Sequence, residues 1–489
     1  MSALHPFDPY QVFQAAAKRY ADRIALRISE REWTYGELET HAAAIAGWCE
    51  RNTPAEARIA VFGKKEVAAY AGILGILRSG RSYVPLHPDH PPVRWRSVLE
   101  QSGAAACIMP SSIGSDIAEE LRIPILNDWS NEVHVPPIPG TEAYVMFTSG
   151  STGGPKGVPV PRHNVAAYLE HMLTRYSFTA EDRFSQLFAL TFDLSVHDLF
   201  VCWGSGACLC VPEDDSALRM SGYVEANAIS SWFSVPSLAA LMRSMRSLRT
   251  GALPSLKHSF FCGEVLSWEV ANSWREAASN SIVVNLYGPT EATIAITEFE
   301  LSQANEQASG TVPLGRVFGK NKAKCVPDTE PNEGELWLSG PQVTEGYLGR
   351  PEETANAFKQ LTGGNERWYA TGDRVRVDAS GILHFIGRTD EQVKVLGHRV
   401  EPAEVDALLA PLVSPGNVLT LPVTLVGITR LVTFIDIEMD TAPLMEHLRA
   451  NLPAYMVPEW IACVGAFPTT AHGKLDRATL ISKVIDEQI

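Results

Sequence analysis

The chain has 489 residues, which is enough for roughly three domain-sized units. It carries 56 acidic and 41 basic residues, so its formal net charge of −15 argues against a nucleic-acid surface, which needs clustered Lys and Arg. No apolar run is long enough for a membrane span, because the most apolar stretch, 418–434, is interrupted by Pro422 and Arg430. The N-terminus lacks the basic and apolar regions of a secretory signal, so a cytoplasmic protein is expected.

Helical and strand patterns alternate through most of the chain. The first helix is expected at 11–20, and Thr34 followed by Glu37 predicts a capping box that opens a second helix, ending near Cys49. A strand at 58–62, a helix at 67–77 and strands at 105–109 and 143–147 follow. This order predicts an α/β core with largely parallel strands.

The pattern changes near residue 390. A hairpin strand is expected at 381–386 and another strand at 392–396, after which Glu401 and Pro402 open a helix with proline in its first turn. We therefore expect a large N-terminal α/β body of several subdomains, with mixed and parallel sheets, over 1–389, and a small α+β domain over 390–489.

The eight cysteines carry no metal-binding or disulfide signature. None forms a CxxC pair, and the group Cys202, Cys208 and Cys210 lies in an apolar segment without a nearby histidine. Reduced, buried thiols are the expectation.

The most informative local feature is the segment TSGSTGGPKG at 148–157, directly after a predicted strand. Its four glycines allow backbone N–H groups to converge on an anion, its four hydroxyl residues add donors, and Lys156 adds positive charge. A flexible linker is the alternative, but linkers of this composition rarely end in Pro-Lys-Gly after an apolar strand. The loop lacks the Gly-Lys-Ser/Thr ending of a P-loop, so the segment predicts a nucleotide phosphate site of another class.

Together with this loop, six further segments, in order along the chain, resemble the adenylate-forming enzymes, the superfamily of acyl-CoA synthetases, luciferases and amino-acid adenylation domains. They are NLYGPTE (285–291), GELWLSG (334–340), YATGD (369–373), GRTDEQVK (387–394), GHRVE (397–401) and GKLDR (473–477). The chain departs from the family pattern at His87, where many members have Asp, and at His472, where Asn is usual. The resemblance implies a large N-terminal domain and a small mobile C-terminal domain.

The resemblance implies ATP-dependent formation of an acyl-adenylate, followed by attack of a thiol. It makes Lys474 the adenylation lysine, Thr290 a phosphate contact and Glu291 the Mg²⁺ ligand. Tyr287 is expected to stack on adenine, and Asp373, with Arg388 nearby, to bind the ribose hydroxyls. The complete set of implied ATP-binding residues is Thr148, Ser149, Gly150, Ser151, Thr152, Lys156, Gly263, Glu264, Asn285, Leu286, Tyr287, Gly288, Asp373 and Arg388.

The acid that is activated depends on FDLSVHD at 192–198. In amino-acid adenylation enzymes, a carboxylate at the position of Asp193 pairs with the substrate α-ammonium, although Asp193 also suits a helix N-cap. The implied substrate-binding residues are Asp193, Leu194, His197, Phe233, Phe260, Cys262, Leu286, Ile294 and Ala295. This mainly aromatic and aliphatic lining, with no second charge besides Lys474, favours a small uncharged amino acid such as proline, alanine or serine.

The resemblance also implies a domain alternation. Asp390 falls on the hinge position, and Lys394 and Gly397 belong to the segment that faces the thiol tunnel in the second half-reaction. Because no carrier-domain signature is present, we expect a stand-alone enzyme that loads the phosphopantetheine of a separate carrier protein in natural-product or cell-envelope biosynthesis. D-alanine–carrier protein ligases and free-standing prolyl or small amino-acid enzymes are the similar types; FCGEVL at 261–266 resembles the former. A monomer is expected.

Two alternatives stay open at this point. An acyl- or aryl-CoA synthetase would use the same nucleotide motifs with a different acid. A nucleotide-binding pseudoenzyme would need no adenylation lysine, so the presence of Lys474 argues against it.

Overall fold

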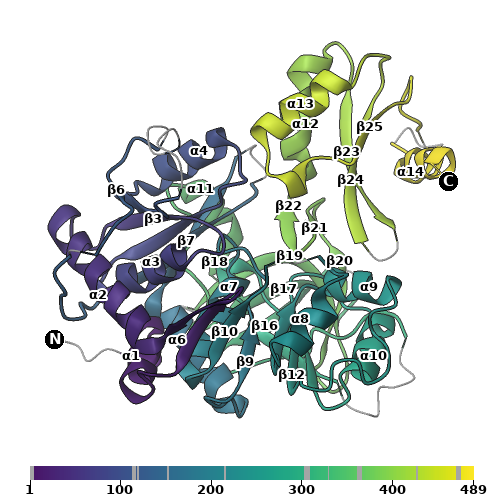
Figure 1. Cartoon of the computed structure of the whole chain (residues 1–489). Coiled ribbons are helices and arrows are strands. Elements are labelled where there is room, and N and C mark those ends of the chain that lie inside the picture. Colours follow the sequence, from purple (N-terminus) through teal and green to yellow (C-terminus); the bar gives the residue numbers. More distant parts are fainter. Residues whose placement is uncertain are drawn as a thin grey trace.

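The computed structural model describes residues 5–488 except 113–116, 118–120, 131, 151–153, 214–215, 302–308, 329, 361–365, 426–427 and 470–474. Within these residues the chain is a mixed α/β protein with a large body and a smaller C-terminal part, which lies above the body in Figure 1. The predicted fold class is therefore confirmed. Among the described residues, no helix combines the length and the apolar character that a membrane span requires.

The first sheet of the body has six strands in the order β6-β5-β3-β4-β7-β8, and all neighbours except β7 and β8 run parallel. Its strands are β3 (Arg58–Phe62), β4 (Ser82–Leu86), β5 (Ala106–Ile108), β6 (Ile125–Leu126), β7 (Glu142–Thr148) and β8 (Lys156–Pro161). The predicted strand at 58–62 is thus confirmed with the same bounds. The Gly-rich loop connects β7 to β8.

The second sheet has nine strands in the order β15-β14-β13-β12-β11-β9-β10-β1-β2, and its six strands from β13 to β1 run parallel. Its strands are β1 (Ile24–Ile28), β2 (Arg31–Thr34), β9 (Arg183–Ser185), β10 (Cys208–Val211), β11 (Ser231–Ser234), β12 (His258–Phe261), β13 (Ile282–Tyr287), β14 (Thr297–Glu300) and β15 (Arg316–Val317). Because parallel strands end at one edge, β11, β12 and β13 bring their C-terminal residues together there.

Helices cover and join these two sheets (Figure 1). One hydrophobic cluster runs from Val61 of β3 through Leu74 and Leu199 to Leu209 of β10, so α3 and α7 share a core with both sheets. The capping box of Thr34 and Glu37 is present and opens α2, as predicted. The helices of the body are α1 (Pro9–Arg19), α2 (Tyr35–Asn52), α3 (Val67–Arg78), α4 (Pro92–Ser102), α6 (Arg162–Arg175), α7 (Leu194–Ser205), α8 (Met220–Ala226), α9 (Pro236–Ser244), α10 (Trp268–Ala277) and α11 (Pro351–Ala357), with the 3₁₀ turn η1 (Thr290–Ala292).

A third sheet of five strands is antiparallel throughout, a departure from the largely parallel core expected. Its strands are β16 (Lys322–Pro327), β17 (Glu333–Ser339), β18 (Phe358–Gln360), β19 (Arg367–Val377) and β20 (Leu383–Arg388). Short connections allow these strands to pair as hairpins without crossover helices.

The C-terminal part begins with a two-stranded hairpin and continues as a three-stranded sheet with helices. Two hydrophobic clusters, one around Val405 and Leu448 and one around Phe434 and Leu480, draw their residues only from positions after Asp390. The elements are β21 (Val393–Val395), β22 (His398–Val400), α12 (Pro402–Val413), β23 (Val418–Leu425), β24 (Ile428–Ile435), α13 (Ala442–Asn451), η3 (Ala454–Met456), β25 (Trp460–Cys463) and α14 (Arg477–Gln488).

All eight cysteines lie in the described part of the chain, and none of them is in a disulfide. Six are buried, whereas Cys325 and Cys463 are partly exposed. The prediction of buried thiols therefore holds for six of the eight positions.

Candidate functional site

The predicted motifs meet where the hairpin β21–β22 lies against the body. A small cavity of about 50 Å³ is lined by residues of the body, including Asp193, Gly263, Gly288, Thr290 and Asp373, and by residues from the hairpin side. The remaining lining residues are Phe192, Leu194, Tyr287, Pro289, Thr371, Arg388, Gln392, Lys394, Gly397 and Arg399. Residues 200 positions apart in sequence therefore surround one space.

Tyr287, Asp373 and Arg388 form a hydrogen-bonded row. The antiparallel register of β19 and β20 sets Asp373 opposite Arg388. The Tyr287 hydroxyl donates to Asp373 Oδ2 at 2.6 Å, and Arg388 Nη1 donates to Asp373 Oδ1 at 2.5 Å. All three residues also line a second, larger cavity of about 500 Å³. This arrangement joins an aromatic ring to a carboxylate, the pair that the resemblance assigns to adenine and ribose.

Asn285 provides a free acceptor in the same region. Its Nδ2 donates to the carbonyl of Pro313 at 2.8 Å, while its buried Oδ1 has no hydrogen-bond partner in the structure. A buried acceptor without a partner is costly, so it suits a ligand that brings a donor such as the amine of adenine. Asn285 lines the 500 Å³ cavity together with Tyr287.

The phosphate loop is described only at its two ends. Ser149 donates from Oγ to the Arg399 carbonyl at 2.5 Å, and the hydroxyl of Thr148 is buried without a partner. Lys156 is buried, and its ammonium lies 4.8 Å from the ring centroid of Tyr347 and 3.9 Å from a carboxylate oxygen of Glu353. Burial lowers the pKa of Lys156. Gly150 is also described, whereas Ser151 and Thr152 lie outside the described residues.

Glu291 is fully buried and paired. Arg399 Nη1 contacts both of its carboxylate oxygens, at 3.0 and 3.3 Å, and the Tyr347 hydroxyl donates to Oε1 at 2.6 Å. Although burial alone would raise it, the pKa of Glu291 is lowered by the guanidinium and the hydroxyl. Thr290, its neighbour in η1, lines the small cavity.

A magnesium ion does not fit Glu291 in this arrangement. Mg²⁺ needs open carboxylate oxygens together with water and substrate phosphates, but Arg399 already contacts both oxygens of Glu291. Within the part of the chain that the structure describes, no three His, Cys, Asp or Glu side chains are grouped so that they could hold a metal. The assignment of Glu291 as a metal ligand stays a prediction that requires Arg399 to move away.

Asp193 is buried without a compensating charge. Its Oδ2 accepts from the backbone N–H of Ile294 at 3.3 Å, and among the described residues no basic side chain forms an ion pair with it. Asp193 stands at the N-cap of α7 but makes no side-chain cap hydrogen bond, so capping does not explain it. Burial raises its pKa to about 7.

The remaining substrate-pocket residues are buried together behind Asp193. The parallel register pairs Phe233 with Phe260, and the ring centroid of His197 lies 4.5 Å from that of Phe233 and 5.3 Å from that of Phe260. Tyr168 and His197 Nδ1 are hydrogen-bonded at 2.7 Å, and burial lowers the pKa of His197 to about 3, so its ring is neutral. Leu194, Cys262, Leu286, Ile294 and Ala295 belong to the same buried cluster.

The hairpin is fastened to the body through Glu264. Its Oε1 accepts from the N–H of Gly397 at 2.8 Å and its Oε2 from the N–H of Ser237 at 2.8 Å. Gly397 has φ +81°, and a Cβ there would lie 2.3 Å from Val235, so only glycine fits this approach. Gly263 packs on the same spot, and the Lys394 ammonium lies 5.7 Å from the Tyr287 ring centroid. Glu264 thus contacts the hairpin backbone.

The two remaining predicted residues belong to the C-terminal part. Asp390, the expected hinge, receives two hydrogen bonds from Arg388, at 2.6 and 2.8 Å. Lys474, the expected adenylation lysine, lies outside the described residues. Its described neighbour Leu475 packs with the cluster around Phe434.

Sequence reasoning missed two residues that contact Glu291. Arg399 lies inside the quoted segment GHRVE but received no role, and Tyr347 lies in a segment that was not quoted. A charge inventory of the motif would have singled out Arg399. No pattern in the sequence points to Tyr347, because its role depends on how the connection between β17 and α11 folds.

Comparisons with known proteins agree with these observations. Residues 13–348 match the family described as AMP-binding enzyme. AMB antimetabolite synthetase AmbB of Pseudomonas aeruginosa is 33% identical over 96% of this chain, which spans 38% of the length of that relative. A D-alanine--D-alanyl carrier protein ligase of Lactiplantibacillus plantarum is 30% identical, with 93% of this chain and 94% of that protein covered.

Solved structures extend the similarity to the whole chain. The adenylation domain AlmE of Vibrio cholerae, crystallised with glycyl-adenosine-5'-phosphate, has a TM-score of 0.88 at 26% identity, with 99% of each chain covered. IdnL7 has a TM-score of 0.73 at 32% identity, with 99% of this chain and 100% of that chain covered. With the family match covering more than half of its residues, the chain belongs to the AMP-binding enzymes.

Proposed function

We propose that this protein activates a small neutral α-amino acid with ATP and transfers it to the phosphopantetheine thiol of a carrier protein. The observation that carries the proposal is Asp193, a buried carboxylate beside the candidate nucleotide site with no cationic partner among the described residues. A buried charge needs a counter-charge, and a substrate ammonium supplies one. A fatty or aryl acid would leave Asp193 unpaired.

The nucleotide would bind between the body and the hairpin. Tyr287 offers a ring face, Asn285 Oδ1 a free acceptor, and Asp373 a carboxylate for the ribose hydroxyls. The ends of the Gly-rich loop, with Ser149 and Lys156, stand where the phosphates would extend. In this proposal the nucleotide extends from the cavity of roughly 500 Å³ to the smaller cavity at Asp193.

The chemistry would proceed in two steps. The amino-acid carboxylate attacks the α-phosphorus of ATP, pyrophosphate leaves, and an aminoacyl-adenylate forms; Lys474 is proposed to stabilise the charge that develops. A thiolate then attacks the acyl carbonyl and AMP leaves. When bound with ATP, Mg²⁺ would neutralise phosphate charge, but no step is assigned to it because Arg399 contacts Glu291 here.

We further propose two domains, 1–389 and 390–489, with the hinge at Asp390. The separate hydrophobic clusters after Asp390 support this division. In the described arrangement Lys394 and Gly397 face the site, which suits the thiol-transfer step rather than adenylation. Adenylation would then require a rotation that removes the hairpin and presents Lys474.

The substrate is proposed to be of the proline, alanine or serine type. The lining behind Asp193 is buried and neutral, and the rings of His197, Phe233 and Phe260 occupy its volume. Similar proteins point the same way: one relative is named for D-alanine, and AlmE was crystallised with a glycyl adenylate. We extend the proposal to natural-product or cell-envelope biosynthesis, which is supported by relatives named antimetabolite synthetase, surfactin synthase and D-alanyl carrier protein ligase.

An ATP–pyrophosphate exchange panel tests the proposal. Exchange is expected with one or a few small D- or L-amino acids and not with fatty or aryl acids. Lys474→Ala should abolish exchange while ATP binding persists. Exchange that responds to fatty or aryl acids alone would instead establish an acyl- or aryl-CoA synthetase. Transfer is tested separately, by mass spectrometry of a phosphopantetheinylated carrier protein incubated with enzyme, ATP and the selected amino acid.

A further inference from the structure

Tyr347 connects two charged residues of the candidate phosphate region. Its hydroxyl donates to Glu291 Oε1 at 2.6 Å, and its ring faces the ammonium of Lys156, 4.8 Å from the ring centroid. The Tyr347 side chain is itself buried, with 8% of the residue exposed. Thus one tyrosine contacts both Glu291, the metal ligand implied by the resemblance, and Lys156, which the proposed function places near the phosphates.

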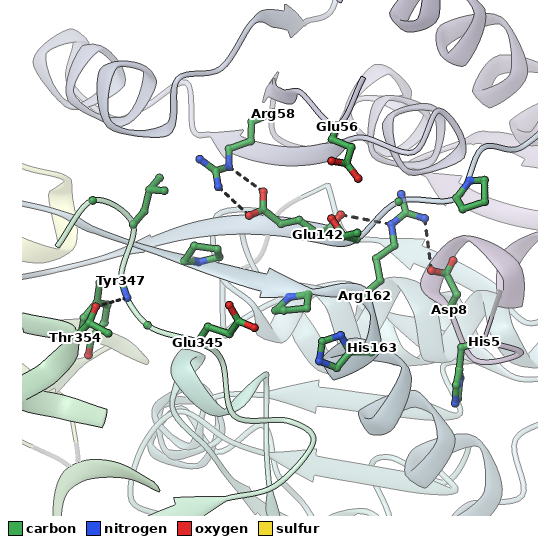
Figure 2. A pocket seen from close by; sticks show the side chains of 18 residues that line it. His5, Asp8, Glu56, Arg58, Glu142, Arg162, His163, Glu345, Tyr347 and Thr354 are labelled. Atoms are coloured by element: carbon green, nitrogen blue, oxygen red, sulfur yellow. Dashed lines mark hydrogen bonds and ion pairs between the residues drawn. The ribbon is translucent and has the colours of Figure 1, made fainter. Parts of the chain in front are cut away.

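The loop that carries Tyr347 is fixed at three points. The N–H of Thr344 donates to the Glu291 carbonyl at 2.8 Å, that of Tyr347 to Thr354 Oγ1 at 2.9 Å, and that of Leu348 to the Gly157 carbonyl at 2.9 Å. Figure 2 shows the bond between Tyr347 and Thr354. Gly346 has φ +143°, and a Cβ there would lie 2.3 Å from Thr354. The loop is therefore tied to both η1 and β8.

The outer side of this loop lines a separate surface groove of about 1060 Å³ (Figure 2). Four of the charged residues that line it form ion pairs with each other, Arg58 with Glu142 and Arg162 with Asp8. The groove therefore carries no proposal of its own. The Tyr347 loop thus lines this groove, while the Tyr347 side chain contacts Lys156 and Glu291.

We propose that Tyr347 is a positioning residue for adenylation, whose hydroxyl holds the Glu291 carboxylate and whose ring confines the Lys156 ammonium. Tyr347, Glu291 and Lys156 all belong to the body, so neither contact depends on the hairpin that carries Arg399. This inference rests on the proposed function, since it assigns Tyr347 to the same reaction. Hydrogen bonds to charged groups and cations held over aromatic rings are strongest where water is excluded, as it is at these buried residues. Both contacts restrict groups that must be aligned before the chemical step.

The alternative is that Tyr347 only fills space. Tyr347→Phe distinguishes a positioning role from space filling, because it removes the hydroxyl and keeps the ring. Tyr347→Leu removes the ring as well. Tyr223→Phe is the matched control: its hydroxyl donates to the Cys210 carbonyl at the same 2.6 Å, and neither residue lines the cavities of the candidate site.

The experiment is steady-state ATP–pyrophosphate exchange with the amino acid that the wild type selects, together with calorimetric ATP binding. Tyr347→Phe should lower kcat about 10- to 100-fold with the amino-acid KM unchanged. Tyr347→Leu should in addition weaken ATP binding several-fold. Thr354→Val, which removes the acceptor for the Tyr347 N–H from the groove side, should give a smaller loss in kcat of the same kind.

Equal kcat values for Tyr347→Phe and Tyr223→Phe would overturn the inference, as would a change in KM with kcat intact. If the wild type exchanged pyrophosphate with no acid, the proposed function would fail instead. In that case ATP affinity still decides the role of the ring, because unchanged binding in Tyr347→Leu contradicts it and weakened binding supports it. Should Tyr347→Leu not fold, Tyr347→Phe and Thr354→Val carry the test.

Discussion

Asp193 and Glu291 are two buried carboxylates of one candidate site in opposite electrostatic states. Glu291 has a guanidinium and a hydroxyl on its oxygens, and its pKa is lowered. Asp193 has only uncharged donors, the backbone N–H of Ile294 and the Thr290 side chain, and burial raises its pKa to about 7. Among the described residues, the hairpin thus supplies a cation for Glu291, whereas no basic side chain pairs with Asp193.

The largest effect is expected on amino-acid activation, when the carboxylate of Asp193 is removed. Asp193→Ala should lower kcat/KM for the amino acid about 100- to 1000-fold, because truncating one partner of a buried charge pair costs about 2–5 kcal/mol. ATP affinity should not change. The measurement is exchange kinetics with calorimetric ATP binding. Amino-acid activation within a few-fold of wild type would show that Asp193 does not bind the ammonium.

The second largest effect is expected on the free energy of unfolding, when Arg399, the partner of Glu291, is removed. Arg399→Ala leaves Glu291 buried and uncompensated, which we expect to cost about 3 kcal/mol. Arg374→Ala is the control, since its ion pair with Asp328 is more exposed and its loss should destabilise the protein less. Denaturant unfolding measures both. If Arg399→Ala lowered the free energy of unfolding less than the control did, Arg399 would not be needed to stabilise the buried charge of Glu291.

The pH dependence of substrate binding sharpens the contrast. Asp193 must be ionised to hold an ammonium, and in the free protein its pKa is about 7. The amino-acid KM should therefore rise as pH falls below about 7, up to tenfold per pH unit. Asp193→Asn should abolish this slope together with most of the binding. A KM independent of pH between 5.5 and 8 would argue against protonation of Asp193.

The stability of the folded protein should depend on pH in the opposite direction from substrate binding, because ionised Asp193 favours binding but disfavours folding. A folded pKa raised from 3.8 to about 7 means that the folded protein binds more protons than the unfolded chain between these values, so this residue favours folding at low pH. Its contribution is lost as pH rises from about 4 to 7. The difference in unfolding midpoint between Asp193→Asn and wild type should grow in favour of the variant over that range. A constant difference would contradict burial of the charge.

The smallest effect is expected at Glu264, a third carboxylate that is only half-buried. Both its oxygens accept backbone N–H groups, from Ser237 and Gly397. Glu264→Gln keeps one acceptor, so transfer to the carrier should slow about fivefold while adenylation is unaffected. Single-turnover thioester formation provides the measurement. Equal slowing of both steps would mean that Glu264 does not act through the hairpin.

The family resemblance, the alternating α/β order and the order of the motifs were all predictable from the sequence alone. These follow from local patterns. The capping box at Thr34 and Glu37 and the strand at 58–62 are short-range signals, and the structure confirms both. The Gly-rich loop is a third such signal, and it lies within the residues that match the family. A phosphate-binding loop can be recognised in a sequence because its glycine, hydroxyl and charged residues come from one short segment.

Which buried charges have partners depends on the tertiary structure. Arg399 and Glu291 are 108 positions apart, and Asp193 and Ile294 are 101 positions apart. No local spacing predicts either contact. The sequence could not tell an N-cap aspartate from an unpaired one, nor give Tyr347 a role. Burial and ion pairing depend on how distant segments pack, and packing sets the pKa values and the fit of ligands on which the proposed chemistry depends.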